Sequence, residues 1–295
     1  MSGSSGVCCD SRVTETRPDR LRTVAEQLAV EAADFARGRR AEIFGAGAGS
    51  RAAGSVQSKS TPTDPVTIAD TETERLLRDR LDALRPGEPI LGEEGGGPAA
   101  AADGGVCWVV DPIDGTVNFV YGIPAYSVSV AAQIDGVSVA GAVADVVSGD
   151  VYSAAVGHGA HVLRGGQRQA LRCTSVDQLA MALVGTGFGY APQRRAEQAA
   201  LLAGILPLVR DVRRIGSAAL DLCMVAEGRL DAHYEHGLHV WDWAAAALVA
   251  SEAGALVRLP GDGDGEGGLL VAAAPGIAAQ LIEALDRLGG LRTLA

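Results

Sequence analysis

A short apolar segment that ends in two carboxylates constrains this chain more than any other feature. Residues 107–110, Cys-Trp-Val-Val, predict a buried strand, and Asp111 and Asp114 follow it directly. Two carboxylates so close together after a strand converge only if the chain turns sharply between them, and Pro112 and Gly115 permit that turn. If a helix begins there, its first backbone amides point outward and form an anion site. The run therefore predicts a place where metal ions and a phosphate group share one turn.

Further acids occupy the same kind of boundary between apolar segments. Asp70 opens a predicted helix over residues 70–84, Glu93 and Glu94 follow a short apolar strand, and Asp242 lies between two tryptophans. An isolated Asp-x-x-Asp pair usually does no more than cap a turn. Clustered anions repel each other strongly, however, so a set of this size is tolerable only if cations bind between its members.

The overall charge supports the same interpretation. The formal net charge is -11 with a sequence pI near 4.9, and no run of Lys or Arg is dense enough to follow a phosphate backbone, so we expect no nucleic acid partner. An acidic protein that handles an anion needs positive charge from elsewhere, and divalent cations supply it. The 47% hydrophobic content with only 4% aromatics predicts an α/β or α+β enzyme whose core is mainly Ala, Val and Leu.

The compartment is predicted from what the sequence lacks. The N-terminus has no apolar stretch that could serve as a secretory signal, and no window approaches the roughly 20 apolar residues of a membrane span. The five cysteines are odd in number and have no C-x-x-C spacing, which favours reduced thiols. We therefore expect a soluble, cytoplasmic protein without a membrane partner.

The chain divides by texture into a tail and two halves. Residues 1–18 predict a disordered tail, residues 19–170 an N-terminal α+β half that carries most of the acids, and residues 171–295 a C-terminal α/β half that completes the site. In the first half, residues 19–44 have the apolar spacing of an amphipathic helix.

The predicted elements follow from local patterns. Thr71 and Glu74 give cap-like chemistry to the helix at residues 70–84. Turn signals at residues 135–136 and 148–149 separate the strands of an antiparallel meander. Its strands are predicted at residues 127–132, 137–147 and 151–155, and the helices of the second half at residues 197–209, 217–227, 242–253 and 275–288.

Four blocks together resemble the inositol monophosphatase family, within the lithium-sensitive, magnesium-dependent sugar-phosphatase superfamily. They are residues 64–70, residues 92–94, residues 108–119, and Trp241-Asp242 followed by Ala253-Gly254. The resemblance spans about residues 20–290. It implies a layered αβαβα sandwich, with an antiparallel sheet in the N-terminal half and a mixed or mostly parallel sheet in the C-terminal half.

The resemblance also implies a ligand set for Mg²⁺. Glu93, Asp111 and the carbonyl of Ile113 would hold one ion, Asp111, Asp114 and Asp242 a second, and a weaker third ion would lie near Glu93. Oxygen-only ligands suit Mg²⁺, which is a hard cation. Thr116 and Asp70 would orient and deprotonate a metal-bound water for direct attack on phosphorus, with Glu93 also in the catalytic set and no phospho-enzyme.

Substrate contacts are implied at further positions. Glu235 matches an acid that binds substrate hydroxyls, and Lys59 matches a lysine on a mobile loop, although a solvated surface lysine is an equally good interpretation. Arg213 reaches either the substrate or a subunit interface, or is an ordinary surface charge. The full substrate set is Asp114, Gly115, Thr116, Arg213, Gly216, Ser217, Ala218, Glu235 and Asp242.

The expected reaction is hydrolysis of inositol 1-phosphate or a similar polyol monophosphate by a homodimer that lithium inhibits. Fructose 1,6-bisphosphatase or a nucleotide 3'-phosphatase would need extra basic groups or an aromatic shelf, which the sequence does not make evident. A regulatory binding protein is the alternative from another class. A zinc site of His233, His236 and His239 is disfavoured, because in an extended segment His236 points away from the other two.

Overall fold

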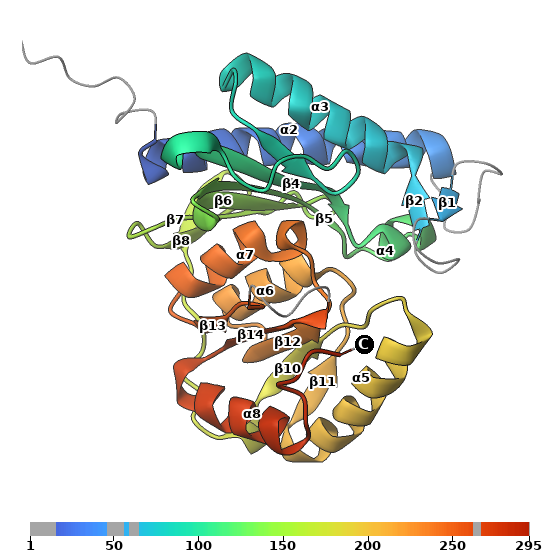
Figure 1. The fold of residues 1–295 in the computed structure, drawn as a ribbon, viewed down its shortest axis with the longest axis vertical. Coiled ribbons are helices and arrows are strands. Elements are labelled where there is room, and N and C mark those ends of the chain that lie inside the picture. Colours follow the sequence, from blue (N-terminus) through green and yellow to red (C-terminus); the bar gives the residue numbers. More distant parts are fainter. Residues whose placement is uncertain (1–15, 46–55, 59–64, 262–266, 295) are drawn as a thin grey trace, which may run out of the picture.

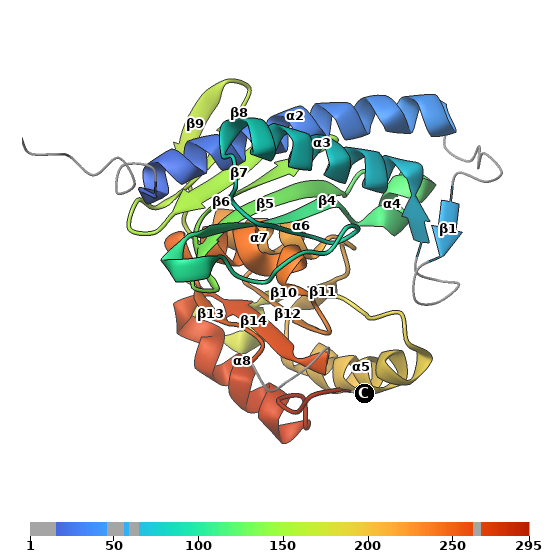
Figure 2. The same cartoon turned by 45° about the horizontal axis from the view of Figure 1, so that its top comes forward.

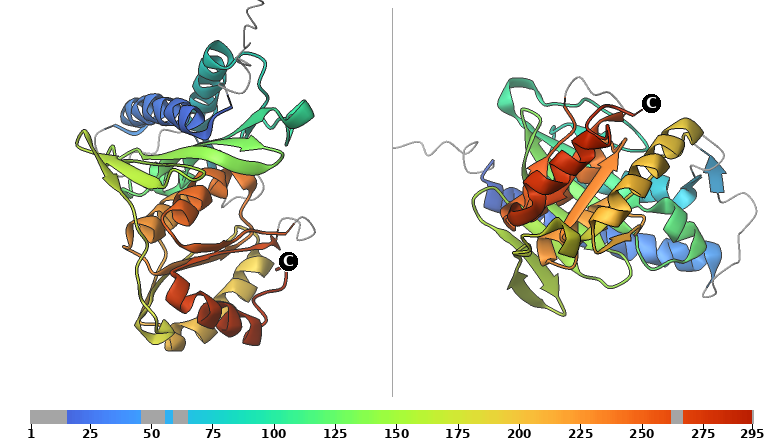
Figure 3. Two further views of the ribbon diagram at one scale, coloured as in Figure 1. Left: turned by 90° about the vertical axis from the view of Figure 1, so that its left-hand side faces the viewer. Right: turned by 90° about the horizontal axis from the view of Figure 1, so that it is seen from below.

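The computed structural model describes residues 16–45, 56–58, 65–261 and 267–294. Within them, two helices cover a seven-stranded sheet, two more helices separate that sheet from a five-stranded one, and a last helix pair covers the outer face (Figure 1). The edge-on view of Figure 3 shows the five layers in this order. The predicted αβαβα sandwich is confirmed.

The outer layer on the first sheet consists of α2 (Pro18–Phe44) and α3 (Ile68–Leu84), which lie side by side in Figure 2. The buried face of α2 is lined with small and branched apolar residues at three- and four-residue spacing. The α3 helix begins two residues earlier than predicted, and its capping box is Thr67 with Asp70. The expected cap at Thr71 and Glu74 is therefore wrong, because Glu74 has another use that is described below.

The seven-stranded sheet runs in chain order, and only β3 and β4 are parallel. Its strands are β3 (Ile90–Gly92), β4 (Val106–Asp114), β5 (Ser127–Ile134), β6 (Val137–Asp145), β7 (Val151–Ala155), β8 (Ala160–Arg164) and β9 (Gln167–Ala170). This is the predicted meander, extended by β8 and β9, which the sequence analysis did not predict. A two-stranded ribbon of β1 (Val56–Ser58) and β2 (Pro65–Thr67) precedes α3.

The five-stranded sheet has the order β11-β10-β12-β14-β13 and is mixed, as predicted. Its strands are β10 (Leu183–Thr186), β11 (Asp211–Arg213), β12 (Ala232–His236), β13 (Leu256–Arg258) and β14 (Leu269–Ala273). The first three pair in parallel, and β14 is antiparallel to both of its neighbours. The outer helices α5 (Pro192–Ile205) and α8 (Pro275–Arg287) cover its far face in Figure 1.

The central layer consists of α6 (Ala218–Glu227) and α7 (Val240–Glu252). Its alanines at residues 244–247 are buried, and Gly141 of β6 leaves room for Ala245, since a Cβ at Gly141 would lie 2.9 Å from the Ala245 Cβ. Close packing of small residues thus brings the N-terminus of α7 against the first sheet. The described ranges also contain α4 (Thr116–Tyr121) and 3-10 turns at Ala102–Gly104, Leu179–Met181 and Leu206–Leu208.

Several predictions concern parts of the chain that the structure does not describe or test. Residues 1–15 of the predicted tail and Lys59 lie outside the described residues. The division of the chain into halves at residue 170 stays a prediction, although all of the first sheet precedes it. Three cysteines in the described part, Cys107, Cys173 and Cys223, are free thiols. No helix in the described part is both long and apolar enough to cross a bilayer.

Candidate active site

A cavity of about 500 Å³ opens between the first sheet and the start of the central helices. Most of the predicted site residues line it, and they come from segments that are far apart in the sequence. They are Glu93, Asp111, Ile113, Asp114, Gly115 and Thr116 from the first half, and Gly216, Ser217, Ala218, Glu235 and Asp242 from the second.

Asp111 and Asp114 both belong to the end of β4. The strand continues through Asp114, and its pairing with β5 shifts between the two acids, from Asp111 opposite Ser129 to Asp114 opposite Ser127. The expected sharp turn is therefore wrong: a bulge inserts an extra residue and re-aims the side chains without ending the strand. The Asp111 carboxylate accepts a hydrogen bond from the Ile113 amide at 3.0 Å, which fixes the bulge.

Asp114 connects the first sheet to the central helices. Its carboxylate accepts hydrogen bonds from the Ser217 hydroxyl at 2.5 Å and from the Ala219 amide at 2.8 Å, at the N-terminus of α6. Burial raises the pKa of Asp114 to about 6, even though these two donors oppose that shift. Ser217 thus contacts an acid of the cavity directly, and its predicted contact with substrate stays a prediction.

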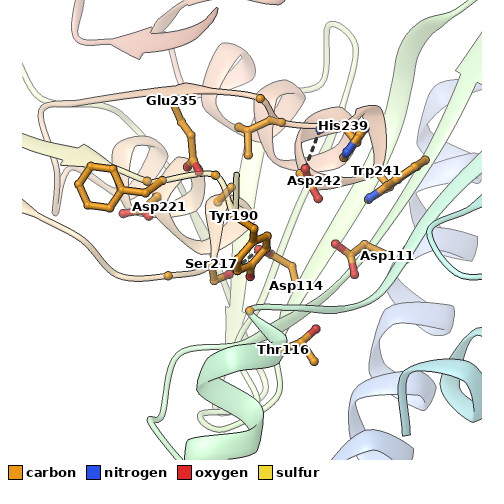
Figure 4. A pocket seen from close by; sticks show the side chains of 18 of the residues that line it. Asp111, Asp114, Thr116, Tyr190, Ser217, Asp221, Glu235, His239, Trp241 and Asp242 are labelled. Carbon is orange, nitrogen blue, oxygen red and sulfur yellow. Dashed lines mark hydrogen bonds between the residues drawn. The ribbon is translucent and has the colours of Figure 1, made fainter. Parts of the chain in front are cut away.

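Asp242 contributes a carboxylate to the site from the start of α7. It occupies the first turn of α7, where its carboxylate accepts a hydrogen bond from the His239 amide at 2.7 Å. In Figure 4 the side chains of Asp111, Asp114 and Asp242 surround one space. Burial and the negative charge of the neighbouring acids, above all Glu93, raise the pKa values of both Asp111 and Asp242 well above the ordinary range. The cavity wall therefore holds more negative charge than its own surroundings compensate.

Glu93 is positioned by an acid that the sequence analysis did not assign to the site. Glu74 of α3 is buried, and its carboxylate accepts hydrogen bonds from the amides of Glu94 at 2.7 Å and Gly95 at 2.8 Å. A Cβ at Gly92 would lie 2.5 Å from the Glu74 carboxyl carbon, so the turn closes around this side chain. The available signal was an acid at the spacing of the buried face of α3, three residues before Leu77.

Replacing Glu74 by Gln should loosen this turn. A Gln side chain has one acceptor oxygen and no charge, so one amide of the turn loses its acceptor and the ion pair with Arg78 is lost, which together cost about 1–3 kcal/mol of unfolding free energy. Glu72→Gln is the matched control, because Glu72 lies on the same helix in a partly exposed ion pair with Arg39 and should cost under about 1 kcal/mol. Chemical denaturation of both variants measures the difference, and equal losses would contradict the assigned role.

Thr116 and Asp70 form the predicted pair. The Thr116 hydroxyl lies 3.0 Å from an Asp70 carboxylate oxygen and 3.0 Å from the Ile113 carbonyl oxygen. It has a single proton and can donate a hydrogen bond to either of these oxygens. Asp70 is fully buried behind Thr116, and burial raises its pKa to about 6. A carboxyl group with this pKa is suited to accept a proton near neutral pH.

The basic and aromatic lining differs from the prediction. Arg213 is exposed and pairs with Asp211 at 2.6 Å, whereas its neighbour Arg214 lines the cavity together with Arg194. Tyr190 and Trp241 also line it, and His239 stacks on Trp241 with 4.8 Å between ring centroids. The cavity therefore contains basic and aromatic groups that the sequence does not make evident. Arg194 lies in the first turn of α5, Arg214 follows β11 and Trp241 lies in the first turn of α7, so sequence spacing could not bring them together.

The three histidines do not form a metal site. His233 and His236 lie on opposite faces of β12, as expected from strand alternation, and His236 lies 2.8 Å from the Gly290 carbonyl. Across the described ranges no three His, Cys, Asp or Glu side chains are already closed around a metal position. The acids of the cavity nevertheless fit Mg²⁺, because their donors are all oxygen and their mutual repulsion needs a cation to relieve it.

Comparison with known proteins agrees with this geometry. A model of the inositol monophosphatase family matches residues 17–289. A protein of Mycobacterium leprae named inositol-1-monophosphatase is 66% identical over 284 residues, covering 95% of this chain and 98% of its own. The solved structure of Mycobacterium tuberculosis SuhB has a TM-score of 0.81 and 61% identity, covering 94% of this chain and all of that one. A Nus factor SuhB of Pasteurella multocida is 37% identical over 77% of this chain and 84% of its own.

Proposed function

The chain belongs to the inositol monophosphatase family and is a phosphatase, and from this premise we propose that it hydrolyses inositol 1-phosphate or a similar polyol monophosphate with Mg²⁺. The observation that carries the proposal is the convergence of Asp111, Asp114, Asp242 and Glu93 on one cavity. Asp111 would contribute to both of two ions. Glu93 and the Ile113 carbonyl would be the further ligands of the first ion, and Asp114 and Asp242 those of the second. A third ion near Glu93 is part of the proposal.

Bound Mg²⁺ would lower the pKa of a coordinated water and neutralise charge on the phosphate. The protein's own contribution is to orient the reactants. Thr116 donates a hydrogen bond to Asp70 or to the Ile113 carbonyl, so its oxygen is free to accept a hydrogen bond from a water in the cavity. As this water loses a proton to Thr116, the Thr116 hydroxyl passes its own proton to Asp70, whose pKa burial raises to about 6.

The alcohol part of the substrate would lie toward Glu235. An ionised carboxylate only accepts hydrogen bonds, so Glu235 suits a leaving group that is rich in hydroxyls. In Figure 4 Glu235 lies on the side of the cavity away from Asp111, and the cavity that both of them line has a volume of about 500 Å³. The start of α6, at Gly216, Ser217 and Ala218, would form one wall of this region.

A second candidate function is hydrolysis of a substrate with another anionic or aromatic group. Arg194 and Arg214 line the cavity and could bind a second phosphate, as in fructose 1,6-bisphosphate, and Tyr190 could stack on a nucleotide base. These contacts extend the range of substrates without changing the acids that carry the chemistry.

Phosphate release with and without Mg²⁺ tests the proposal. We expect turnover of inositol 1-phosphate only with Mg²⁺, and millimolar lithium should inhibit it. Faster turnover of fructose 1,6-bisphosphate or a nucleotide would favour the second candidate. A stoichiometric protein partner together with no phosphatase activity on any ester would favour a regulatory role instead. The homodimer and the cytoplasmic location stay predictions, which sedimentation and fractionation can test.

A further inference from the structure

Behind Glu235 lies a buried polar group that the proposed chemistry does not use. His233 of β12 is fully buried, between Asp221 of α6 and Glu235 two residues further along its own strand. Its Nδ1 is 3.9 Å from an Asp221 carboxylate oxygen, and its Nε2 is 3.4 Å from a Glu235 oxygen. The side chains of Asp221 and Glu235 are only 2% and 12% exposed.

Hydrogen bonds among the described residues do not explain the burial of His233. Within the described residues, both His233 nitrogens and one Asp221 oxygen are buried without any atom in hydrogen-bond geometry. Unpartnered polar atoms in an interior are costly and uncommon. The free-energy cost of burying these polar atoms is offset only by charge attraction, with a protonated imidazole between the two carboxylates.

The electrostatic surroundings favour that state. Burial by itself lowers the pKa of His233, but the Glu235 and Asp221 carboxylates outweigh it, so that its pKa is raised. Asp114 adds to this effect from the cavity side. Burial raises the pKa of Asp221 to about 7, against the opposing effects of His233 and Arg214.

Two glycines, one in the neighbouring strand β10 and one just after it, leave space for the three side chains. A Cβ at Gly185 of β10 would lie 3.0 Å from both the Asp221 Oδ1 and the His233 Nδ1 atoms. A Cβ at Gly187 would lie only 2.1 Å from the Glu235 Oε1 atom. Neither glycine needs a left-handed backbone, so space for the polar cluster accounts for both.

We propose that His233 is a positioning residue, whose protonated ring pairs electrostatically with Glu235 on its Nε2 side and with Asp221 on its Nδ1 side and so holds the Glu235 carboxylate toward the cavity to accept substrate hydroxyls. This inference rests on the proposed function. Without His233, Glu235 would be a lone acid facing Asp114 and the other carboxylates, and repulsion would turn it away from its place. The effect should therefore appear only with substrates whose hydroxyls reach Glu235.

Two isosteric variants separate the donor to Glu235 from the bulk of the ring. In His233→Gln the amide nitrogen occupies the position of Nε2, and in His233→Asn it occupies that of Nδ1. We expect His233→Asn to raise the KM for inositol 1-phosphate about tenfold with little change in kcat, and His233→Gln, whose amide can donate to Glu235 but carries no charge, to recover part of that loss. With phenyl phosphate, a monoester without hydroxyls, both variants should stay within about twofold of the unmodified protein.

Two controls make the result decisive. Tyr234→Phe changes a buried side chain on the opposite face of β12 that does not line the cavity, so it should alter thermal stability at most, without a substrate-dependent change in KM. Glu235→Gln combined with His233→Asn should be no worse than Glu235→Gln alone, because both act through one contact.

Equal effects of His233→Asn on the two esters, or equal KM values for the Asn and Gln variants with inositol 1-phosphate, would overturn the inference. Fully additive effects in the double variant would do the same. If the unmodified protein with Mg²⁺ releases phosphate from neither ester, the proposed function itself fails, and this inference fails with it.

Discussion

Replacing Asp111 by Asn should reduce phosphate release at least about a thousandfold at saturating Mg²⁺, because it removes the carboxylate proposed to be shared by two ions. The protein should still fold. The Asn oxygen can accept the Ile113 amide as Asp111 does, and the substitution removes a buried charge whose neighbours repel it. In the absence of metal, the variant should therefore melt at the same temperature as the unmodified protein or higher.

Asp145→Asn is the matched control for this experiment. Asp145 also accepts backbone amides, from Val147 and Ser148, at the end of a strand of the same sheet, and it does not line the cavity. Its activity should stay near that of the unmodified protein. Retained turnover in Asp111→Asn would contradict the assignment of Asp111 as a shared ligand, whereas equal losses in both variants would indicate a defect in folding.

Removing Mg²⁺ should make the stability of the protein strongly dependent on pH. The folded-state pKa of Asp70 and of Asp114 is raised to about 6, above the ordinary value of 3.8, so the folded protein binds more protons than the unfolded chain between these values. The free energy of unfolding without metal must then fall as the pH rises through this range. Asp221, with a pKa raised to about 7, extends the fall toward neutral pH.

Bound Mg²⁺ reverses the balance, because it stabilises the ionised carboxylates that line the cavity. The stabilisation by Mg²⁺ should therefore be small near pH 5 and grow to several kcal/mol by pH 8, which corresponds to a melting temperature about 10 °C higher. Thermal unfolding at fixed ionic strength, with Mg²⁺ or with EDTA, measures it. A difference that does not change with pH would mean that these carboxylates are not neutralised by the metal.

Much of the fold follows from local patterns in the sequence. The alternation of apolar strands and turn signals predicts the meander from β5 to β7, and the spacing of α2 predicts its buried face. The short strands β8 and β9 escape prediction because β9 is exposed and carries no apolar alternation. The start of α3 is missed by two residues, since the sequence does not distinguish Thr67 from Thr71 as the cap.

The candidate site could be predicted only where chemistry is written into contiguous motifs. Asp111, Asp114 and Thr116 lie in one run, and the resemblance adds Glu93 and Asp242. The supports of these residues depend on long-range contacts. Glu74 reaches a turn twenty residues away, and Arg214, not Arg213, reaches the cavity, because the short strand β11 ends between them.

Diffraction from crystals soaked in Mn²⁺ tests the central claim most directly, since Mn²⁺ accepts the same hard oxygen ligands as Mg²⁺ and scatters anomalously. We predict anomalous density in direct contact with the Asp111 carboxylate, and with Asp114 and Asp242 on one side or Glu93 on the other. Crystals that bind Mn²⁺ only at sites remote from these four carboxylates would contradict the account.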